Sequence, residues 1–406
     1  MNKKSKVDAR IEPVSRNKTA DVIVTVLFLA VIFGFGTAIL LIPDNEFSED
    51  ENRYLQKFPT YSSVSSFAKA LADGSFGEDI SEYYSDQFPL RNYFVGAKAV
   101  NEMLLLKGQN NDVVFGKDGY LLKRFDHSDE EMLFSNLDGI DEKLSETGLP
   151  VYMIIPPRSQ DILHTKLPES FPKELSDALY ERLNAYMADA DLTYIDLREL
   201  LKKADSDGKE IYYKTDHHWR SGGAELVYRA LAETIGFEPF TDLERKTVTE
   251  SFFGTTWSAA GAKWISPDKI DIFVSDDDEG FVTEHIKYND ISRLTGTDED
   301  ITKRFEGFYD EKALEQKDKY SYFLSGNPAF ARVYKDTNVK REKVLLIKDS
   351  FVNSLVPFLA RHYDLDLVDP RYYQGSVKAL TELSDYEFIL CCINMDILTT
   401  QSVRLF

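Results

Sequence analysis

Two short segments of the sequence carry side chains suited to nucleophilic catalysis. In the segment 214–220, Asp216, His217 and His218 stand just before a predicted helix. In the other, Ser350 closely follows an apolar run that is typical of a buried strand. A serine hydroxyl is a weak nucleophile at neutral pH, so it needs a histidine base that a carboxylate in turn orients. These residue types would suit acyl transfer through a serine.

The spacing of these residues is compatible with such a triad. Asp216 and His218 are two residues apart, so in an extended segment both side chains share one face and His217 points away. Ser350 stands at the carboxyl end of a predicted strand, where open α/β sheets bind their ligands. The chain order Asp, His, Ser is no obstacle, because geometry defines a triad.

Other roles for the same residues remain open on this evidence alone. A serine at a strand end is also typical of a turn or a helix cap. An Asp-x-His pair is often only a hydrogen-bonded loop. Asp216 with two histidines could also bind a metal, although the sequence shows no further cluster of ligands nearby.

The elements that must position these residues alternate between strand and helix. A hairpin is predicted around residues 117–119, and apolar strands are predicted at 151–155, 193–197, 344–347 and 388–393. Helices are predicted at 129–146, 172–187 and 223–234. This alternation predicts an α/β fold with a mostly parallel sheet covered on both faces. Residues 240–340 are polar and break the rhythm, so we interpret them as an insertion that helps build or cover a site.

One apolar segment near the N-terminus is long enough to cross a membrane. Residues 22–42 contain no charged side chain, and basic residues precede them. The positive-inside rule then places residues 1–21 in the cytoplasm and the rest of the chain outside, with a helical stalk at 43–105 and the main domain at 106–406. A cleaved signal peptide is the competing interpretation, but the apolar run continues past Gly36-Thr37-Ala38, its one plausible cleavage site.

Composition narrows the classes of partner. The formal net charge of -21 over 406 residues argues against nucleic acid, which requires basic patches. The two cysteines, Cys391 and Cys392, are adjacent within an apolar run, so we expect two buried free thiols and no disulfide.

Several motifs together resemble the DHHW family of bacterial membrane-anchored proteins. The segment Asp216-His217-His218-Trp219 matches the motif that names the family. Further matching segments are Ser48–Arg53, Asp86–Arg91, Gly116–Leu121, Phe253–Thr256 and Asp318–Tyr320 leading to Gly326-Asn327. The resemblance covers roughly residues 45–400.

That family is similar to the SGNH-hydrolase-like proteins that O-acetylate alginate. The resemblance implies a three-layer α/β/α sandwich, with Ser350 as nucleophile, His218 as base and Asp216 as orienting carboxylate. It implies a serine-dependent O-acetyltransferase or acetylesterase on an extracellular polysaccharide or cell-wall polymer, without a cofactor or metal. From the same resemblance we also expect a multi-pass membrane partner that delivers acyl groups. Lys348 stands where the alginate-type pattern has glycine. Together with the long acidic insertion and the lack of a separate lectin domain, this departure motivates the alternative of a non-catalytic glycan-binding or scaffold protein.

Other residues are candidates for binding. Arg158 and Asn327 could assist the backbone N–H of Ser350 in holding a developing oxyanion. Aromatic side chains that could stack on a sugar are Trp257, Trp264, Tyr372 and Tyr373, whereas Trp219 is expected in the core because it directly follows the motif.

Overall fold

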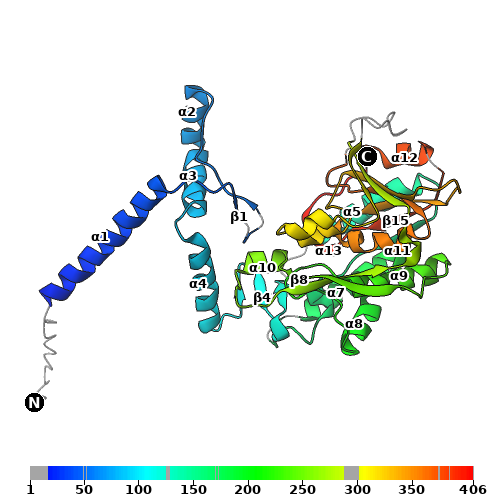
Figure 1. Cartoon of the computed structure of the whole chain (residues 1–406), viewed down its shortest axis with the longest axis horizontal. Helices are drawn as coiled ribbons and strands as arrows, with labels where there is room; N and C mark the ends of the chain where they lie inside the picture. The colour runs from blue at the N-terminus through cyan, green and yellow to red at the C-terminus, as the bar shows by residue number, and fades with distance from the viewer. Residues whose placement is uncertain are drawn as a thin grey trace, which may run out of the picture. The chain divides into compact units, whose positions relative to one another are not determined.

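The computed structural model describes residues 17–48, 50–51, 53–124, 129–169, 171, 173–287, 301–373, 375–383 and 385–405. The chain forms two compact units (Figure 1). The first comprises Met1–Ser48 and Arg53–Val95, and the second comprises Glu49–Asn52 and Gly96–Phe406.

The first unit contains the apolar helix expected near the N-terminus. Helix α1 (Lys18–Leu41) has 24 residues, and an 18-residue window within Lys18–Ile39 has a mean hydropathy of 2.7 with none of its residues buried. By length and composition it fits a membrane anchor or a signal sequence. Most of the predicted tail, 1–21, lies outside the described residues. The elements that follow α1 are β1 (Phe47–Ser48), β2 (Arg53–Tyr54), α2 (Val64–Asp73), α3 (Ser75–Asp86) and α4 (Arg91–Leu104), which continues into the second unit.

The second unit is built on an eight-stranded mixed sheet. Its strand order is β11 (Ile301–Glu306), β10 (Phe281–Ile286), β12 (Phe330–Lys335), β14 (Asp364–Val368), β13 (Lys343–Lys348), β15 (Tyr386–Cys392), β6 (Val151–Ile154) and β7 (Thr193–Ile195). The strands from β14 to β7 pair in parallel, and β12, β10 and β11 continue the sheet antiparallel.

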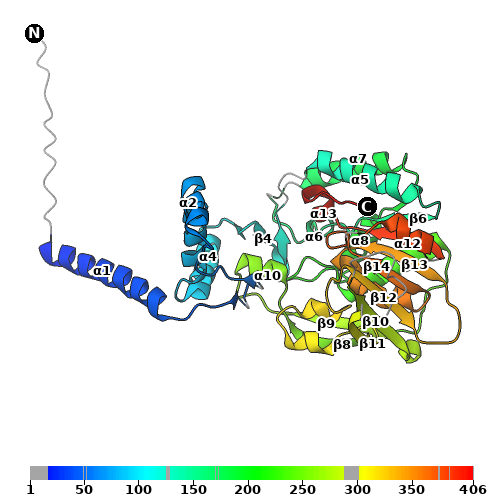
Figure 2. The ribbon, with the colours of Figure 1, turned by 90° about the horizontal axis from the view of Figure 1, so that it is seen from above.

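Side chains from alternate strand positions form a separate hydrophobic core on each face of this sheet. On β13, Val344 and Leu346 pack into one core, and Leu345 and Ile347 pack into the other. The first core is closed by helices α8 (Arg198–Ser206), α9 (Ser221–Ile235) and α11 (Val356–Ala360). The second is closed by α5 (Glu130–Ser145), α7 (Lys173–Met187), α12 (Val377–Leu383) and α13 (Met395–Thr400) (Figure 2). The predicted three-layer α/β/α sandwich is therefore confirmed.

The polar stretch 240–340 is more regular than its sequence indicates. It supplies the antiparallel strands β10, β11 and β12, and a separate hairpin of β8 (Glu244–Phe252) and β9 (Asp268–Val274). Helix α10 (Thr255–Ala260) lies in the segment of chain that connects these two strands. Residues 288–300 of the stretch lie outside the described part. The stretch thus extends the main sheet.

Three adjacent parallel strands end at the same edge of the sheet. Residues just beyond the carboxyl ends of β13, β15 and β6 are Ser350, Asn394 and Arg158. The predicted hairpin is also present, as β4 (Val113–Phe115) and β5 (Leu121–Lys123), next to β3 (Gln109–Asn110). Both cysteines of β15 are buried free thiols, as expected.

Candidate active site

Ser350 sits in a tight turn that follows β13 and is fixed by its neighbour Asp349. One carboxylate oxygen of Asp349 accepts the N–H of Phe351 at 2.8 Å and so caps the short 3-10 helix Ser350–Ser354. The other oxygen accepts both the backbone and the side-chain N–H of Asn394, each at 2.6 Å. These contacts tie the ends of two neighbouring strands together and leave the Ser350 side chain at the sheet edge.

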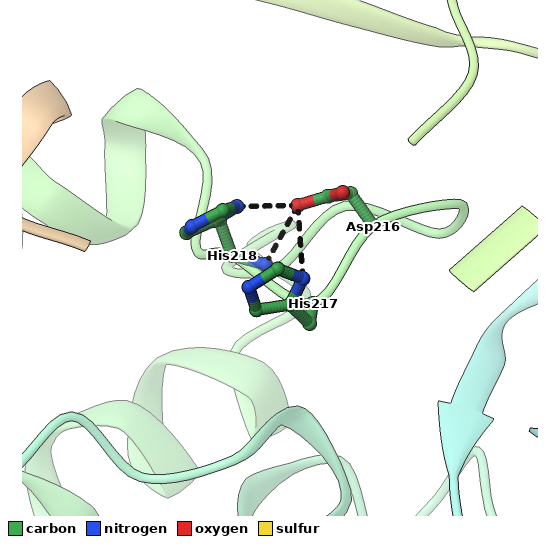
Figure 3. Close-up of side chains that lie close together, drawn as sticks. All are labelled: Asp216, His217 and His218. Carbon is green, nitrogen blue, oxygen red and sulfur yellow. Dashed lines mark hydrogen bonds and ion pairs between the residues drawn. The ribbon is translucent and has the colours of Figure 1, made fainter. Parts of the chain in front are cut away.

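The structure brings Asp216, His218 and Ser350 into one hydrogen-bonded chain. His218 Nε2 lies 2.6 Å from Ser350 Oγ. His218 Nδ1 lies 2.5 Å from Asp216 Oδ1, and Figure 3 shows these two side chains facing each other. All three residues are buried, with 2% of Asp216, 5% of His218 and 8% of Ser350 exposed. A carboxylate, an imidazole and a hydroxyl in this order form the arrangement that activates a serine.

Asp216 is held by groups that the sequence did not assign to the site. Its Oδ2 accepts the backbone N–H of Thr255 at 2.8 Å and the Thr255 hydroxyl at 3.0 Å. Burial opposes the charge of Asp216, but the two imidazoles and these hydrogen bonds outweigh it, so the pKa of this carboxyl lies well below its ordinary value. A Cβ on Gly254 would lie 2.2 Å from Asp216 Cβ, so only glycine fits there. Thr255 and Gly254 belong to one of the segments that carry the family resemblance.

The motif segment is a bent loop and not an extended strand. Residues 214–218 form bends, and the N–H of His218 bonds back to Asp216 Oδ1 at 3.0 Å, as in an Asx turn. The expectation that His217 points away is therefore wrong. Its Nδ1 lies 2.8 Å from the Thr255 hydroxyl, and its ring lies beside that of His218, with centroids 3.9 Å apart.

Aromatic side chains fix the His218 ring. Tyr320 stacks on it, with 3.9 Å between ring centroids and 8° between planes, and donates its hydroxyl to the Ser350 carbonyl at 3.1 Å. Trp219 is fully buried, as expected, and donates its indole N–H to the Phe351 carbonyl at 3.0 Å. Tyr320 lies in another of the segments that carry the resemblance, and that was its one signal in the sequence.

A cavity of about 390 Å³ opens beside Ser350. Four basic side chains and one acidic side chain line the cavity, so its local charge is positive, whereas the net charge of the whole chain is negative. The lining residues are Lys123, Arg124, Arg158, His217, Ser350, Arg371, Asn394, Asp396, Ile397, Thr399, Thr400 and Gln401. Arg158 thus lies at the cavity as predicted, with its guanidinium bonded to Asp161 at 2.8 Å.

The remaining predicted binding residues lie elsewhere. Trp257 is only 7% exposed and packs against Phe253, which corrects the expectation that its face is open to a glycan. Trp264 and Tyr372 are exposed, at 40% and 55%, but neither is among the residues that line the cavity. Asn327 is likewise not part of the lining, and its amide oxygen accepts from Asn353 at 3.1 Å.

Lys348 does not crowd the cavity. Its side chain is fully buried, and its Nζ donates to Asn353 Oδ1 at 2.7 Å and to Asn327 Oδ1 at 3.4 Å. Burial lowers the pKa of Lys348 to about 8, although two nearby carboxylates favour the charged form. Lys348 is thus placed to brace the turn that carries Ser350.

The motif also groups potential metal ligands. One donor atom from each of Asp216, His217 and His218 lies within 4.8 Å of the others. However, Asp216 Oδ1 and His218 Nδ1 are already bonded to each other, and His218 Nε2 faces the serine hydroxyl. A metal at these atoms would have to displace the hydrogen-bonded chain, so the two uses exclude each other.

Comparison with known proteins places this site in context. Residues 113–262 match the family model described as "SGNH hydrolase-like domain, acetyltransferase AlgX", a range that includes the Asp216-His218 segment and ends before Ser350. The chain is 26% identical over 194 residues to a probable alginate O-acetylase AlgJ of Pseudomonas fluorescens, across 45% of this chain and 48% of that protein. A probable AlgJ of Pseudomonas putida is 25% identical over 172 residues, 41% of this chain and 44% of its own length. The chain thus spans about half the length of the curated relatives it matches.

Two solved structures share the fold over nearly three quarters of this chain. A DHHW family protein from Eubacterium siraeum aligns with a TM-score of 0.57 and 19% identity, over 72% of this chain and 94% of that chain. PatB1 of Bacillus cereus, solved with a sulfonyl adduct, aligns with a TM-score of 0.57 and 22% identity, over 73% and 99%. The fold that the motif resemblance implies is thereby confirmed.

Proposed function

We propose that this chain, which is similar to SGNH-hydrolase-like and DHHW family proteins, is a serine-dependent O-acetyltransferase of the cell envelope. The observation that carries the proposal is the chain of hydrogen bonds from Asp216 through His218 to Ser350. The names of the matched relatives, probable alginate O-acetylases, support the same class of reaction.

In the first step, Ser350 Oγ attacks the carbonyl carbon of an acyl donor while His218 Nε2 takes its proton. Asp216 keeps the imidazole in the tautomer with a proton on Nδ1 and stabilises the cation that forms. His218 then returns the proton to the leaving group, which departs and leaves an acyl ester on Ser350. The developing oxyanion is held in this proposal by the backbone N–H of Ser350, at the open start of a helical turn, and by the side-chain amide of Asn394.

In the second step, a hydroxyl group of the acceptor attacks the acyl ester. His218 takes the proton of that hydroxyl and passes it to the departing Ser350 oxygen, which restores the enzyme. Water in place of the acceptor gives esterase activity. The acceptor in this proposal is a polysaccharide or cell-wall polymer, which enters through the cavity beside Ser350.

In the same proposal the reaction takes place at a membrane, which the length and apolar composition of helix α1 support. Uncleaved, the helix anchors the chain with the N-terminus in the cytoplasm and the catalytic unit outside. There, a multi-pass partner can deliver acyl groups through the bilayer. The test is protease treatment of intact cells, which should digest the second unit while the chain that precedes α1 stays protected; protection of both parts would contradict this orientation.

The alternative of a non-catalytic glycan-binding or scaffold protein was motivated in part by Lys348. The Nζ of Lys348 is bonded to Asn353, and Lys348 is not among the residues that line the cavity, so this residue no longer favours that alternative.

The enzymatic proposal is tested by acetyl-ester turnover with p-nitrophenyl acetate as donor. Ser350→Ala should lower kcat by about 10,000-fold or more, because removal of the nucleophile leaves only the remaining binding groups. Ser206→Ala, on the exposed end of α8, is the matched control and should behave as wild type. Full turnover by Ser350→Ala would refute the mechanism.

A further inference from the structure

His217 occupies a position that the proposed reaction does not yet use. Its side chain is 24% exposed and lines the cavity together with Ser350. In Figure 3 one ring nitrogen faces Asp216 and the other lies on the opposite side of the ring. Because its Nδ1 is 3.7 Å from Asp216 Oδ1, against 2.5 Å for His218, the carboxylate serves His218 as its direct partner.

The tautomer of His217 follows from its partner Thr255. The Thr255 hydroxyl has one proton, and two groups could accept it: Asp216 Oδ2 at 3.0 Å and His217 Nδ1 at 2.8 Å. The ionised carboxylate can only accept, and a hydrogen bond to a charged group is about twice as strong as a neutral one. The proton of Thr255 therefore goes to Asp216, and His217 Nδ1 must itself donate to the hydroxyl oxygen.

The other nitrogen of this ring is then an acceptor. Burial and the neighbouring His218 lower the pKa of His217 to about 3, so the ring is neutral at neutral pH. A neutral imidazole that carries its proton on Nδ1 has a lone pair on Nε2. Among the described residues, none bonds to this Nε2, whereas the Nε2 of His218 faces Ser350.

Two imidazole acceptors therefore lie side by side, with ring centroids 3.9 Å apart. His217 lines the cavity itself, and the Nε2 of His218 faces Ser350, which also lines it. One of them, His218, takes the proton of the attacking hydroxyl in the proposed reaction. A hydroxyl has a single proton, so the same hydroxyl cannot also donate to the second ring. The neighbouring hydroxyl of a sugar, on the next ring carbon, can reach it.

We propose that His217 Nε2 binds the hydroxyl adjacent to the one that is acylated, so that the enzyme selects acceptors with a vicinal diol. This inference rests on the proposed function and narrows its substrate class. His217 acts here as a specificity residue of the second step. The acid–base chemistry itself stays with His218.

The experiment uses the full chain in detergent with p-nitrophenyl acetate as donor. The acceptors are cis-cyclohexane-1,2-diol and cyclohexanol, which differ in the second hydroxyl. We measure the ratio of acetyl transfer to the two alcohols, because this ratio is independent of the rate of acylation. Wild type should prefer the diol by about tenfold, the contribution of one well-placed hydrogen bond.

Variants of His217 separate the inference from a structural role. His217→Phe keeps a ring but has no acceptor, so its ratio should fall to about two, the statistical value for two hydroxyls against one. His217→Gln presents a carbonyl oxygen and should regain part of the preference. A wild-type ratio near two would overturn the inference, and so would a His217→Phe variant that keeps the preference. Complete loss of ester turnover in His217→Phe would also overturn it, because the ring would then act in the chemistry.

The same data keep this inference apart from the proposed function. If Ser350→Ala turns over ester at the wild-type rate, the proposed mechanism itself fails. If turnover requires Ser350 and the diol is not preferred, only the role of His217 fails.

Discussion

The two sides of the Ser350 hydroxyl differ in how their polar groups are partnered. On the buried side, Asp216 accepts hydrogen bonds from His218 and Thr255 with both of its oxygens, and Tyr320 covers the imidazole. On the cavity side, the lining is charged and open; the ion pair of Lys123 and Asp396 there keeps 44% and 32% of its side chains exposed.

We infer from this difference that the buried side carries out the catalytic chemistry and that the cavity side selects the acceptor. Groups that hold the base are desolvated and fully bonded, so their positions are fixed by the fold before any substrate arrives. On the cavity side, the paired side chains of Lys123 and Asp396 stay partly exposed to solvent, where a ligand can contact them. We therefore expect substitutions on the buried side to lower turnover of every ester, and substitutions on the cavity side to change which acceptor is used.

The largest effect should come from His218. His218→Ala removes the base and should lower kcat for p-nitrophenyl acetate by about 10,000-fold or more. Residues that act as one unit are not additive, so the double variant with Ser350→Ala should be no slower than either single variant. A further loss of activity in the double variant would mean that the two residues act independently.

A smaller loss should follow from crowding the carboxylate. Gly254→Ala would put a methyl group 2.2 Å from Asp216 Cβ, which must then shift. Overpacking of this kind costs about 1–3 kcal/mol in stability, and a misplaced catalytic group can cost about 100-fold in rate. The measurements are chemical unfolding and ester turnover.

Gly139 provides the matched control. It lies inside helix α5, and a Cβ there would meet nothing within 4 Å. Gly139→Ala should therefore raise the free energy of unfolding by about 0.5–1 kcal/mol and leave turnover as it is. If Gly254→Ala had the same stability and turnover as Gly139→Ala, the close approach of Gly254 to Asp216 would matter neither for folding nor for catalysis.

The burial of Lys348 can be tested by the pH dependence of the free energy of unfolding. Its pKa is lowered to about 8 in the folded chain from an ordinary 10.5. Between these values the unfolded chain binds more protons, so the stability contributed at this site rises with pH. The free energy of unfolding of wild type minus that of Lys348→Met should increase by on the order of 1 kcal/mol per pH unit from pH 8 to 10. A difference that is flat in pH would show that Lys348 is not desolvated as described.

The smallest expected effect is that of a chelator. Asp216 Oδ1 and His218 Nδ1 are each other's partners, so the proposed chemistry needs no metal ion at the motif. Ester turnover after treatment with EDTA should equal that before it. Loss of turnover that added Zn²⁺ restores would assign the motif to a metal instead.

Much of the fold follows from local patterns in the sequence. The apolar runs that became β6, β13 and β15 are long and bounded by turn signals, so their type was predictable. Strands β10 and β12 were not predicted, because they lie in a polar stretch and pair with partners far along the chain. Non-local pairing leaves little trace in a local window.

The same division holds for the site. Ser350, His218 and Asp216 were predictable from the strand end and the motif. Thr255 and Tyr320 contact the motif from distant segments, and their local sequence does not predict that contact. His217 was misplaced because alternation of faces applies to extended backbone, whereas this loop turns through the bond from His218 N–H to Asp216.

The most direct test of the account is covalent trapping of the nucleophile. The full chain is treated with phenylmethylsulfonyl fluoride and its peptides are mapped by mass spectrometry. We predict one sulfonyl group per chain, on Ser350, in wild type and none in His218→Ala, because the imidazole activates this hydroxyl. An unmodified Ser350, or equal labelling in His218→Ala, would contradict the claim that Asp216, His218 and Ser350 form a working nucleophile.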